Sequence, residues 1–210
     1  MAQTTSPLVI TISRELGSGG SYIGHKLAER LNMYYADHEI ITKTAENLSV
    51  LLEDVESHEE KITSFWENFW TNTGIQEFYN EAIGSFVPTS AKIFEAEAHV
   101  MQEIVKEHSA VIIGRCGFYV LRDYPNLVNV FLHGSVEARA KRLMDVRHIS
   151  ELEAKTQIAA SDKSRAQYIK KFTKKDWNDA KNYHLSIDTG EIGFDNAIDV
   201  IMKYIDSRKI

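Results

Sequence analysis

The chain has little of three things that often dominate a sequence: cysteine, proline and long apolar runs. Cys116 is the only cysteine among 210 residues, so no disulfide can form within the chain, which fits a reducing compartment. Only three prolines occur, and no glycine- or serine-rich linker separates one part of the chain from another. No apolar run reaches the ~20 residues that cross a bilayer, and residues 1–7 lack the pattern of a signal peptide. We therefore expect one cytoplasmic domain over residues 1–210, with no membrane partner.

Positive charge is also scarce overall, but it is concentrated in one segment. The net charge is −6, yet between Arg139 and Lys175 eleven lysines and arginines stand against four acids. An acidic protein with one basic segment is poorly suited to wrapping duplex nucleic acid and well suited to closing on a small polyanion. We expect a small anionic ligand and no nucleic-acid partner. A solvated helical face is the plainer alternative for this segment.

The most informative stretch is a glycine-rich turn between a predicted strand and a predicted helix. An apolar run at 8–12 leads into the turn, and Ile23, Leu27 and Leu31 then recur at helical spacing. Backbone N–H groups of such a turn, with the positive end of the helix behind it, bind phosphate. The predicted phosphate-binding residues are Gly17, Ser18, Gly19, Gly20, Ser21 and Tyr22.

This turn departs from the Walker A pattern G-x-x-x-x-G-K-S/T at two of its four fixed positions. With Gly19 and Ser21 aligned on the last glycine and the hydroxyl residue, Gly20 stands at the lysine position and Arg14 at the first glycine. Ser21 can still bind a magnesium ion, whereas the usual ammonium group is missing. We hypothesise that arginines supply its charge, with Arg14 as the first candidate. The turn alone leaves open that it only packs helix on strand.

Further strands are predicted at 33–36, 110–114, 127–132 and 184–188, with helical segments between them. This alternation is typical of a parallel, doubly wound α/β sheet. Asp37 and Arg115 each follow a predicted strand, at the carboxyl edge where ligands of open α/β folds bind. The planar guanidinium of Arg115 suits a phosphate, whereas Asp37 is also a good helix N-cap.

The segment from 44 to 107 is helical in pattern and acidic, with thirteen acids against three lysines. Its aromatic residues recur at three- and four-residue spacing, which is more typical of a core or a partner surface than of a base-stacking site. This segment is a candidate for acceptor binding, for a homodimer face, or for both. The aromatic residues are Phe65, Trp66, Phe69, Trp70, Phe78 and Tyr79.

Five segments in this order resemble the P-loop nucleoside monophosphate kinases, most closely their cytidylate kinase-like branch, which shares the absent lysine. The resemblance implies a three-layer α/β/α fold with a five-stranded parallel sheet, and an ATP- and magnesium-dependent kinase. It divides the chain into a core (1–43, 108–138 and 183–210), a helical acceptor segment (44–107) and a basic mobile lid (139–182). The matching segments are residues 12–21, 35–41, 111–116, 162–168 and 185–189.

The resemblance also implies roles for single residues. Arg115 matches an arginine that contacts the acceptor phosphate, and Arg165 matches a lid arginine that reaches the transferring phosphoryl group. Cys116 replaces the acid that follows this first arginine in cytidylate kinases, which removes one expected contact to the nucleoside. We predict Arg14, Arg115 and Arg165 as catalytic, Ser21 on magnesium, Arg139, Arg142 and Thr189 in donor binding, and Asp37, Asp162 and Lys163 in acceptor binding.

Two alternatives remain open at this point. One is a nucleotide-binding regulatory protein with little or no transfer activity, which Gly20 and Cys116 favour and Arg115 and Arg165 oppose. The other is a kinase for a small non-nucleotide alcohol.

Overall fold

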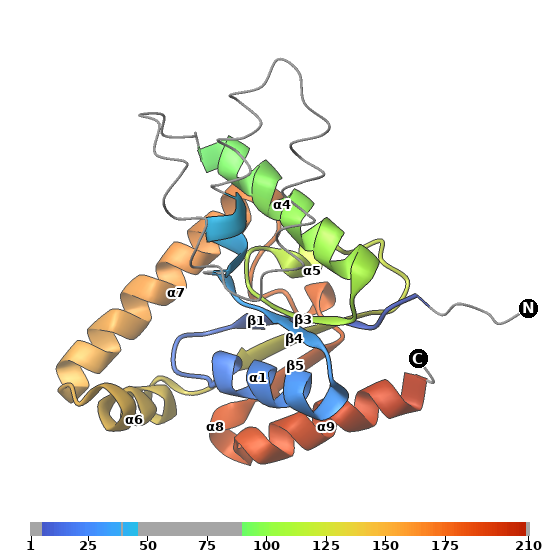
Figure 1. Cartoon of the computed structure of the whole chain (residues 1–210). Helices are drawn as coiled ribbons and strands as arrows, with labels where there is room; N and C mark the ends of the chain where they lie inside the picture. The colour runs from blue at the N-terminus through green and yellow to red at the C-terminus, as the bar shows by residue number, and fades with distance from the viewer. Residues whose placement is uncertain (1–5, 39, 46–89, 209–210) are drawn as a thin grey trace, which may run out of the picture. The chain divides into compact units, whose positions relative to one another are not determined.

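A five-stranded parallel sheet forms the centre of the fold. The computed structural model describes residues 6–38, 40–45 and 90–208, and the chain divides into two compact units, 1–38 with 101–210 and 39–100. The strands, all in the first unit, pair in the order β2-β3-β1-β4-β5, which confirms the predicted sheet (Figure 1). They are β1 (Val9–Arg14), β2 (Tyr34–Ala36), β3 (Ala110–Ile113), β4 (Leu127–His133) and β5 (Leu185–Asp188).

Helices cover both faces of this sheet and make the three predicted layers. Helices α1 and α9 lie along one face and α5 lies on the other (Figure 1). A further helix, α4 (Ser90–Glu107), runs from the second unit into the first. The remaining helices of the first unit are α1 (Gly20–Leu31), α5 (Gly117–Val120), α6 (Val136–Arg147), α7 (Glu151–Thr173), the 3-10 turn η2 (Ala180–Asn182), α8 (Thr189–Ile192) and α9 (Phe194–Arg208).

Strand β1 shows how the sequence builds the layers. Its side chains alternate between the two faces, so Ile10 and Ile12 enter a fully buried cluster that includes residues of α1 and α9. Each such side chain contributes about 1.5–3 kcal/mol through burial. Between them, Thr11 faces the layer of α5, and its hydroxyl donates to Asn129 Oδ1 at 2.6 Å. The central strand is thereby fixed on both faces, which fixes the position of the loop that follows it.

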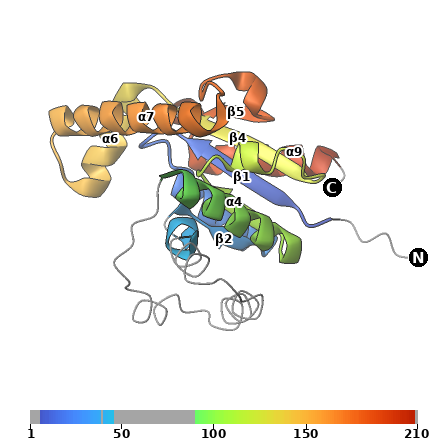
Figure 2. The ribbon, with the colours of Figure 1, turned by 90° about the horizontal axis from the view of Figure 1, so that it is seen from above.

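Helices α6 and α7 make up most of the predicted lid region, 139–182. They form a hairpin and lie side by side in both views (Figures 1 and 2). Ser150 caps α7 by accepting from the Glu153 N–H at 3.3 Å. The two helices join through Ala140, Leu143, Ala154 and Ile158, which form a small buried cluster of their own.

In the second unit, the structure describes residues 40–45 and 90–100, both helical. Thr42 Oγ1 donates to Glu97 Oε1 at 3.0 Å, and this contact helps to satisfy a fully buried carboxylate. The aromatic residues between 65 and 79 lie outside the described residues, so acceptor binding and a dimer face there stay predictions. Of the helices that the structure describes, none is long and apolar enough to span a membrane.

Candidate functional site: an arginine-lined pocket beside a glycine loop

The glycine loop joins β1 to α1 and presents free backbone donors. Gly17 and Gly19 have φ angles of +88° and +81°, and a Cβ on Gly19 would lie 2.5 Å from the ring of Phe194. The N–H groups of residues 19–22 donate to no acceptor in the described part of the chain, and no side chain caps α1. Unpaired N–H groups at the first turn of a helix form an anion-binding site.

A buried ion-pair network holds this loop in place. Arg139 of α6, which is 5% exposed, contacts Glu15 Oε2 through Nε at 3.2 Å and Asp162 Oδ2 through Nη1 at 2.6 Å. It also donates to the carbonyl oxygens of Gly134 (2.9 Å) and Leu16 (3.2 Å). Asp162 Oδ1 in turn accepts from the Leu16 N–H at 3.0 Å. Donor binding by Arg139 and acceptor binding by Asp162 stay predictions, and the contacts of both residues position the loop.

Arg14, the last residue of β1, fills the space beside the first turn of α1. A Cβ added to Gly20 would lie 2.6 Å from Arg14 Cγ, and a Cβ added to Gly114 would meet the Arg14 guanidinium. Gly20 does not have a positive φ angle, so its backbone accepts any residue. The stem of Arg14 is therefore what excludes a side chain at the position where a Walker loop carries lysine.

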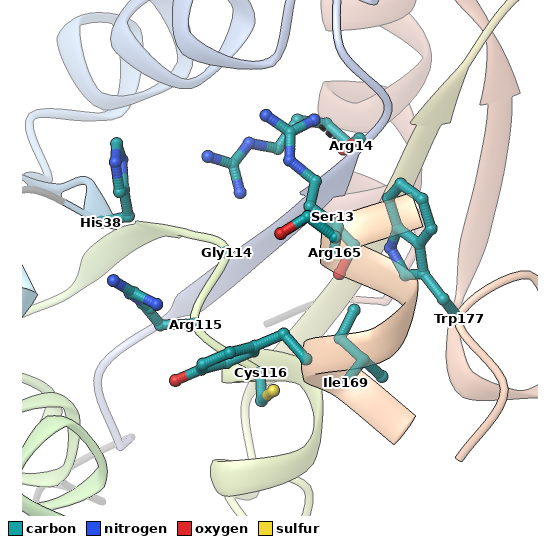
Figure 3. Close-up of a pocket in the computed structure, with 11 residues that line it drawn as sticks. Ser13, Arg14, His38, Gly114, Arg115, Cys116, Arg165, Ile169 and Trp177 are labelled. Carbon is teal, nitrogen blue, oxygen red and sulfur yellow. Dashed lines mark hydrogen bonds between the residues drawn. The ribbon is translucent and has the colours of Figure 1, made fainter. Parts of the chain in front are cut away.

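Three arginines surround a pocket of about 200 Å³ at the carboxyl edge of the sheet. Figure 3 shows Arg14 from β1, Arg115 from the turn after β3 and Arg165 from α7 around this hollow. Arg165 Nη1 donates to the carbonyl oxygen of Arg14 at 2.9 Å, and Arg115 lies over the Tyr168 ring at 5.1 Å. The structure thus brings together the three residues that were predicted to be catalytic.

The electrostatics of this pocket favour an anion. The Arg14 side chain is largely buried and forms no hydrogen bond or ion pair with any described residue. Burial, with the nearby charges of Arg165 and Arg115, lowers the pKa of Arg14 to about 10, so it remains charged at neutral pH. Burial also lowers the pKa of Arg165. A buried cation is stabilised by a bound anion, which carries the opposite charge.

Backbone strain marks the turn that carries Arg115. Gly114, Arg115 and Cys116 all have positive φ angles, of 80°, 47° and 57°. A residue other than glycine rarely adopts this conformation, and it costs of order 1–3 kcal/mol. Cys116 is buried and lines the same pocket, so the strained turn directs both side chains toward it.

Other predicted donor- and acceptor-binding residues lie outside the pocket. The Arg142 guanidinium lies 4.2 Å from the centre of the Phe194 ring. The Thr189 hydroxyl is shared between the carbonyl oxygens of Ser18 (2.9 Å) and His133 (3.1 Å), which ties the glycine loop to the end of β5. Lys163 is exposed and does not line the pocket.

Ser21 and its surroundings fit a magnesium ion. Ser21 is exposed at the first turn of α1, close to the buried hydroxyl of Tyr35. Burial raises the pKa of Tyr35, and the nearby Asp37 carboxylate raises it further. The described residues contain no cluster of three metal-binding side chains, but Mg²⁺ commonly takes one or two protein oxygens with substrate phosphates.

Several pocket residues escaped the sequence prediction, among them Ser13, His38, Tyr168 and Trp177. Tyr168 follows Arg165 by three residues on α7, so helical spacing alone could have placed the two on one face. Trp177 lies beyond the end of α7 and reaches the pocket through a turn that shows no periodic pattern.

The protein-family comparison matches residues 9–191 to the cytidylate kinase-like family. The chain belongs to this family. A cytidylate kinase from Thermosipho melanesiensis is 30% identical over 221 residues, covering 96% of this chain and 98% of that one. A cytidylate kinase from Shouchella clausii is 31% identical over 163 residues, covering 69% and 70% of the two chains. Membership of the cytidylate kinase-like family confirms the predicted resemblance and the class of nucleotide kinase.

Solved structures agree with this family's fold. An uncharacterized protein from Eubacterium ventriosum has a TM-score of 0.72 and 25% identity, covering 95% of this chain and 99% of that one. Shikimate kinase from Bacteroides thetaiotaomicron has a TM-score of 0.51 and 13% identity, covering 95% and 98%. The second likeness concerns the fold alone, and the P-loop kinase fold predicted from the sequence is confirmed.

Proposed function

We propose that the protein transfers the γ-phosphoryl group of ATP to a nucleoside monophosphate or a similar small acceptor. One observation carries this proposal: Arg14 places a largely buried charge, with no ion-pair partner among the described residues, between the N–H groups of the glycine loop and the pocket of Arg115 and Arg165. An unpaired charge in such a place is costly in the free protein, and a phosphate group relieves that cost.

The positions of these side chains and N–H groups suggest which of them bind the donor, the acceptor and the phosphoryl group in transfer. The loop N–H groups hold the donor phosphates, and Ser21 holds magnesium, which neutralises charge on them. Arg115, on its strained turn, faces the acceptor phosphate, and Arg165 stabilises the charge on the oxygens of the group in transfer. Phosphoryl transfer depends mainly on such positioning and positive charge, and requires little covalent chemistry from the protein.

Arg14 takes the part of the missing lysine in this proposal. It reaches the phosphates from the end of β1, whereas a Walker lysine reaches them from the first turn of the helix. Its stem occupies the space next to Gly20, so the two arrangements exclude each other.

A nucleotide acceptor is supported by the two relatives that are named cytidylate kinases. The regulatory alternative is less well supported because three arginines and a strained turn exceed what donor binding alone requires. Selectivity for cytidine is not part of the proposal, since Cys116 stands where the family's nucleoside-contacting acid is expected.

The experiment is incubation with Mg-ATP and a panel of nucleoside monophosphates and small alcohols, followed by separation of the products. We expect transfer to at least one monophosphate. Arg165→Ala should abolish transfer while ATP affinity stays within about threefold, and Arg30→Ala, an exposed arginine paired with Asp199, serves as the matched control. ATP binding without transfer to any acceptor would contradict the proposal and favour the regulatory alternative.

A further inference from the structure

A second basic pocket lies at the opposite edge of the sheet. Its cavity, of about 330 Å³, falls at the lower end of the range of small-molecule sites, about 300–1,000 Å³. It is lined at the amino end of β4 by Leu127 and Asn129, and just before β5 by Tyr183 and His184. The arginine-lined pocket lies at the carboxyl edge, so this second cavity belongs to no part of the proposed catalytic site.

The charged side chains that line this cavity are all basic. Four cationic side chains line it, Arg122, Lys175, Lys181 and Arg208, and no carboxylate does. In a chain with a net charge of −6, this is a marked local excess. Arg122 Nε pairs with the exposed Asp123 Oδ2 at 3.5 Å, and Asp176 and Asp179 lie near Tyr183. Lys175, Lys181 and Arg208 form no ion pair with any residue that the structure describes.

Most hydrogen-bonding capacity of these cations is unused. Lys175 and Lys181 are exposed, and neither side chain forms an ion pair or hydrogen bond with a described residue. Arg122 and Arg208 each donate through one Nη1 to a backbone carbonyl, of Tyr119 at 2.8 Å and of Leu127 at 2.6 Å. Arg122 also lies over the Tyr119 ring and Arg208 over the Tyr204 ring, which helps to hold both side chains in place. A guanidinium has five donors, so each arginine retains donors for a ligand.

Neutral donors complete the lining. His184 Nδ1 accepts from the Asn129 N–H at 2.8 Å, so the neutral ring carries its proton on Nε2. Burial, with the charge of Arg208, lowers the pKa of His184. Asn182 adds an amide to the same cavity. Four cations with additional N–H donors exceed the needs of a carboxylate and suit the several oxygens of a phosphate.

We propose that this amino-edge pocket is a second anion site, which binds a small phosphorylated metabolite through Arg122, Lys175, Lys181 and Arg208. The inference is independent of the proposed kinase reaction, because the two pockets share no lining residue. An aromatic cluster separates them: the Tyr183 hydroxyl donates to the Trp177 carbonyl at 2.9 Å, and both rings contact Phe131.

The test is calorimetric titration of the full chain with inorganic pyrophosphate in the absence of magnesium. We expect two binding events, one at the glycine loop and one at the amino-edge pocket. Lys175→Gln/Lys181→Gln should weaken one event at least tenfold, while Lys155→Gln/Lys203→Gln removes the same charge elsewhere and should leave both. Arg14→Ala/Arg165→Ala should keep the amino-edge event and lose the other. Thermal unfolding checks that every variant is folded.

A second readout locates the ligand. In wild-type protein, the NMR signals of the His184 ring, assigned with His184→Gln, should shift on titration, and the shift should be lost in Lys175→Gln/Lys181→Gln. Titration with ribose 5-phosphate and with inorganic phosphate distinguishes an organic ligand from the free ion. Unchanged binding in the double lysine variant, or an equal loss in the matched control, overturns the proposal. Loss of the glycine-loop event alone would count only against the proposed function.

Discussion

Exchanging the residues at positions 14 and 20 tests whether Arg14 replaces the Walker lysine. The two side chains compete for one space, because a Cβ on Gly20 would lie 2.6 Å from Arg14 Cγ and 3.0 Å from its Cβ. Gly20→Lys alone should therefore be harmful although it restores a Walker-like sequence. Arg14→Ala alone should also be harmful, since it removes the charge. The double variant Arg14→Ala/Gly20→Lys should be more active than either single variant.

The expected magnitudes follow from the two effects. An arginine acting on a transferring phosphoryl group contributes about 10³–10⁵ in rate, or about 4–7 kcal/mol at 1.36 kcal/mol per tenfold change. Forcing a side chain against Arg14 costs about 1–3 kcal/mol of stability. If lysine regains even a fraction of the lost rate, the double variant should exceed Arg14→Ala at least tenfold, a gain of about 1.4 kcal/mol in transition-state stabilisation.

The assay is kcat/KM for ATP with the best acceptor, measured for the four members of this cycle. Arg14→Ala/Gly20→Met is the matched control, because it fills the same space without a charge. Thermal unfolding separates loss of fold from loss of chemistry. A double variant no more active than Arg14→Ala, or a methionine variant as active as the lysine variant, would refute the reasoning.

Three further predictions concern the loop and its charge. Arg139→Gln should lower the free energy of unfolding by about 3–5 kcal/mol in urea titrations, because it leaves two carboxylates of a buried network unpaired; a loss no larger than that of Arg142→Gln would contradict this. Gly19→Ala should weaken ATP binding at least tenfold in calorimetry, since the φ angle of +81° and the Phe194 ring both oppose a side chain; unchanged affinity would show that the loop adapts. Phosphate affinity should stay level from about pH 8 to 9 and fall as pH rises through about 10, where Arg14 loses its proton and with it the attraction; a flat titration to pH 11 would exclude Arg14 from the site.

The sheet and the glycine loop could be predicted because local patterns encode them. A continuous apolar run such as Ala110–Ile113 is typical of a strand buried on both faces, and its glycine and arginine then fall at the carboxyl edge. Arg14 and Arg115 could be selected because each comes just after a predicted apolar strand, whereas Arg165 was selected through the family resemblance. Parallel topology then brings them together.

Partner choice among charged residues could not be predicted in the same way. Arg139 and Arg142 lie three residues apart on α6 and look equivalent in sequence. The packing of α6 against α7 buries Arg139 beside Asp162, while Arg142 lies over Phe194. Tertiary contacts with residues more than twenty positions away in the sequence decide which of the two arginines forms a structural ion pair. The amino-edge pocket is hidden for the same reason, because its four cations come from four separate segments.

The network around Arg139 has a consequence for how the enzyme cycles. Its contacts join the start of α6 and the middle of α7 to the residues just before the glycine loop, so these two helices cannot move away together without breaking buried ion pairs. If residues 139–182 contain the lid that the sequence predicts, the part that opens must therefore lie beyond these contacts. The loop proposed to hold the donor phosphates would then keep its shape while that part opens and closes.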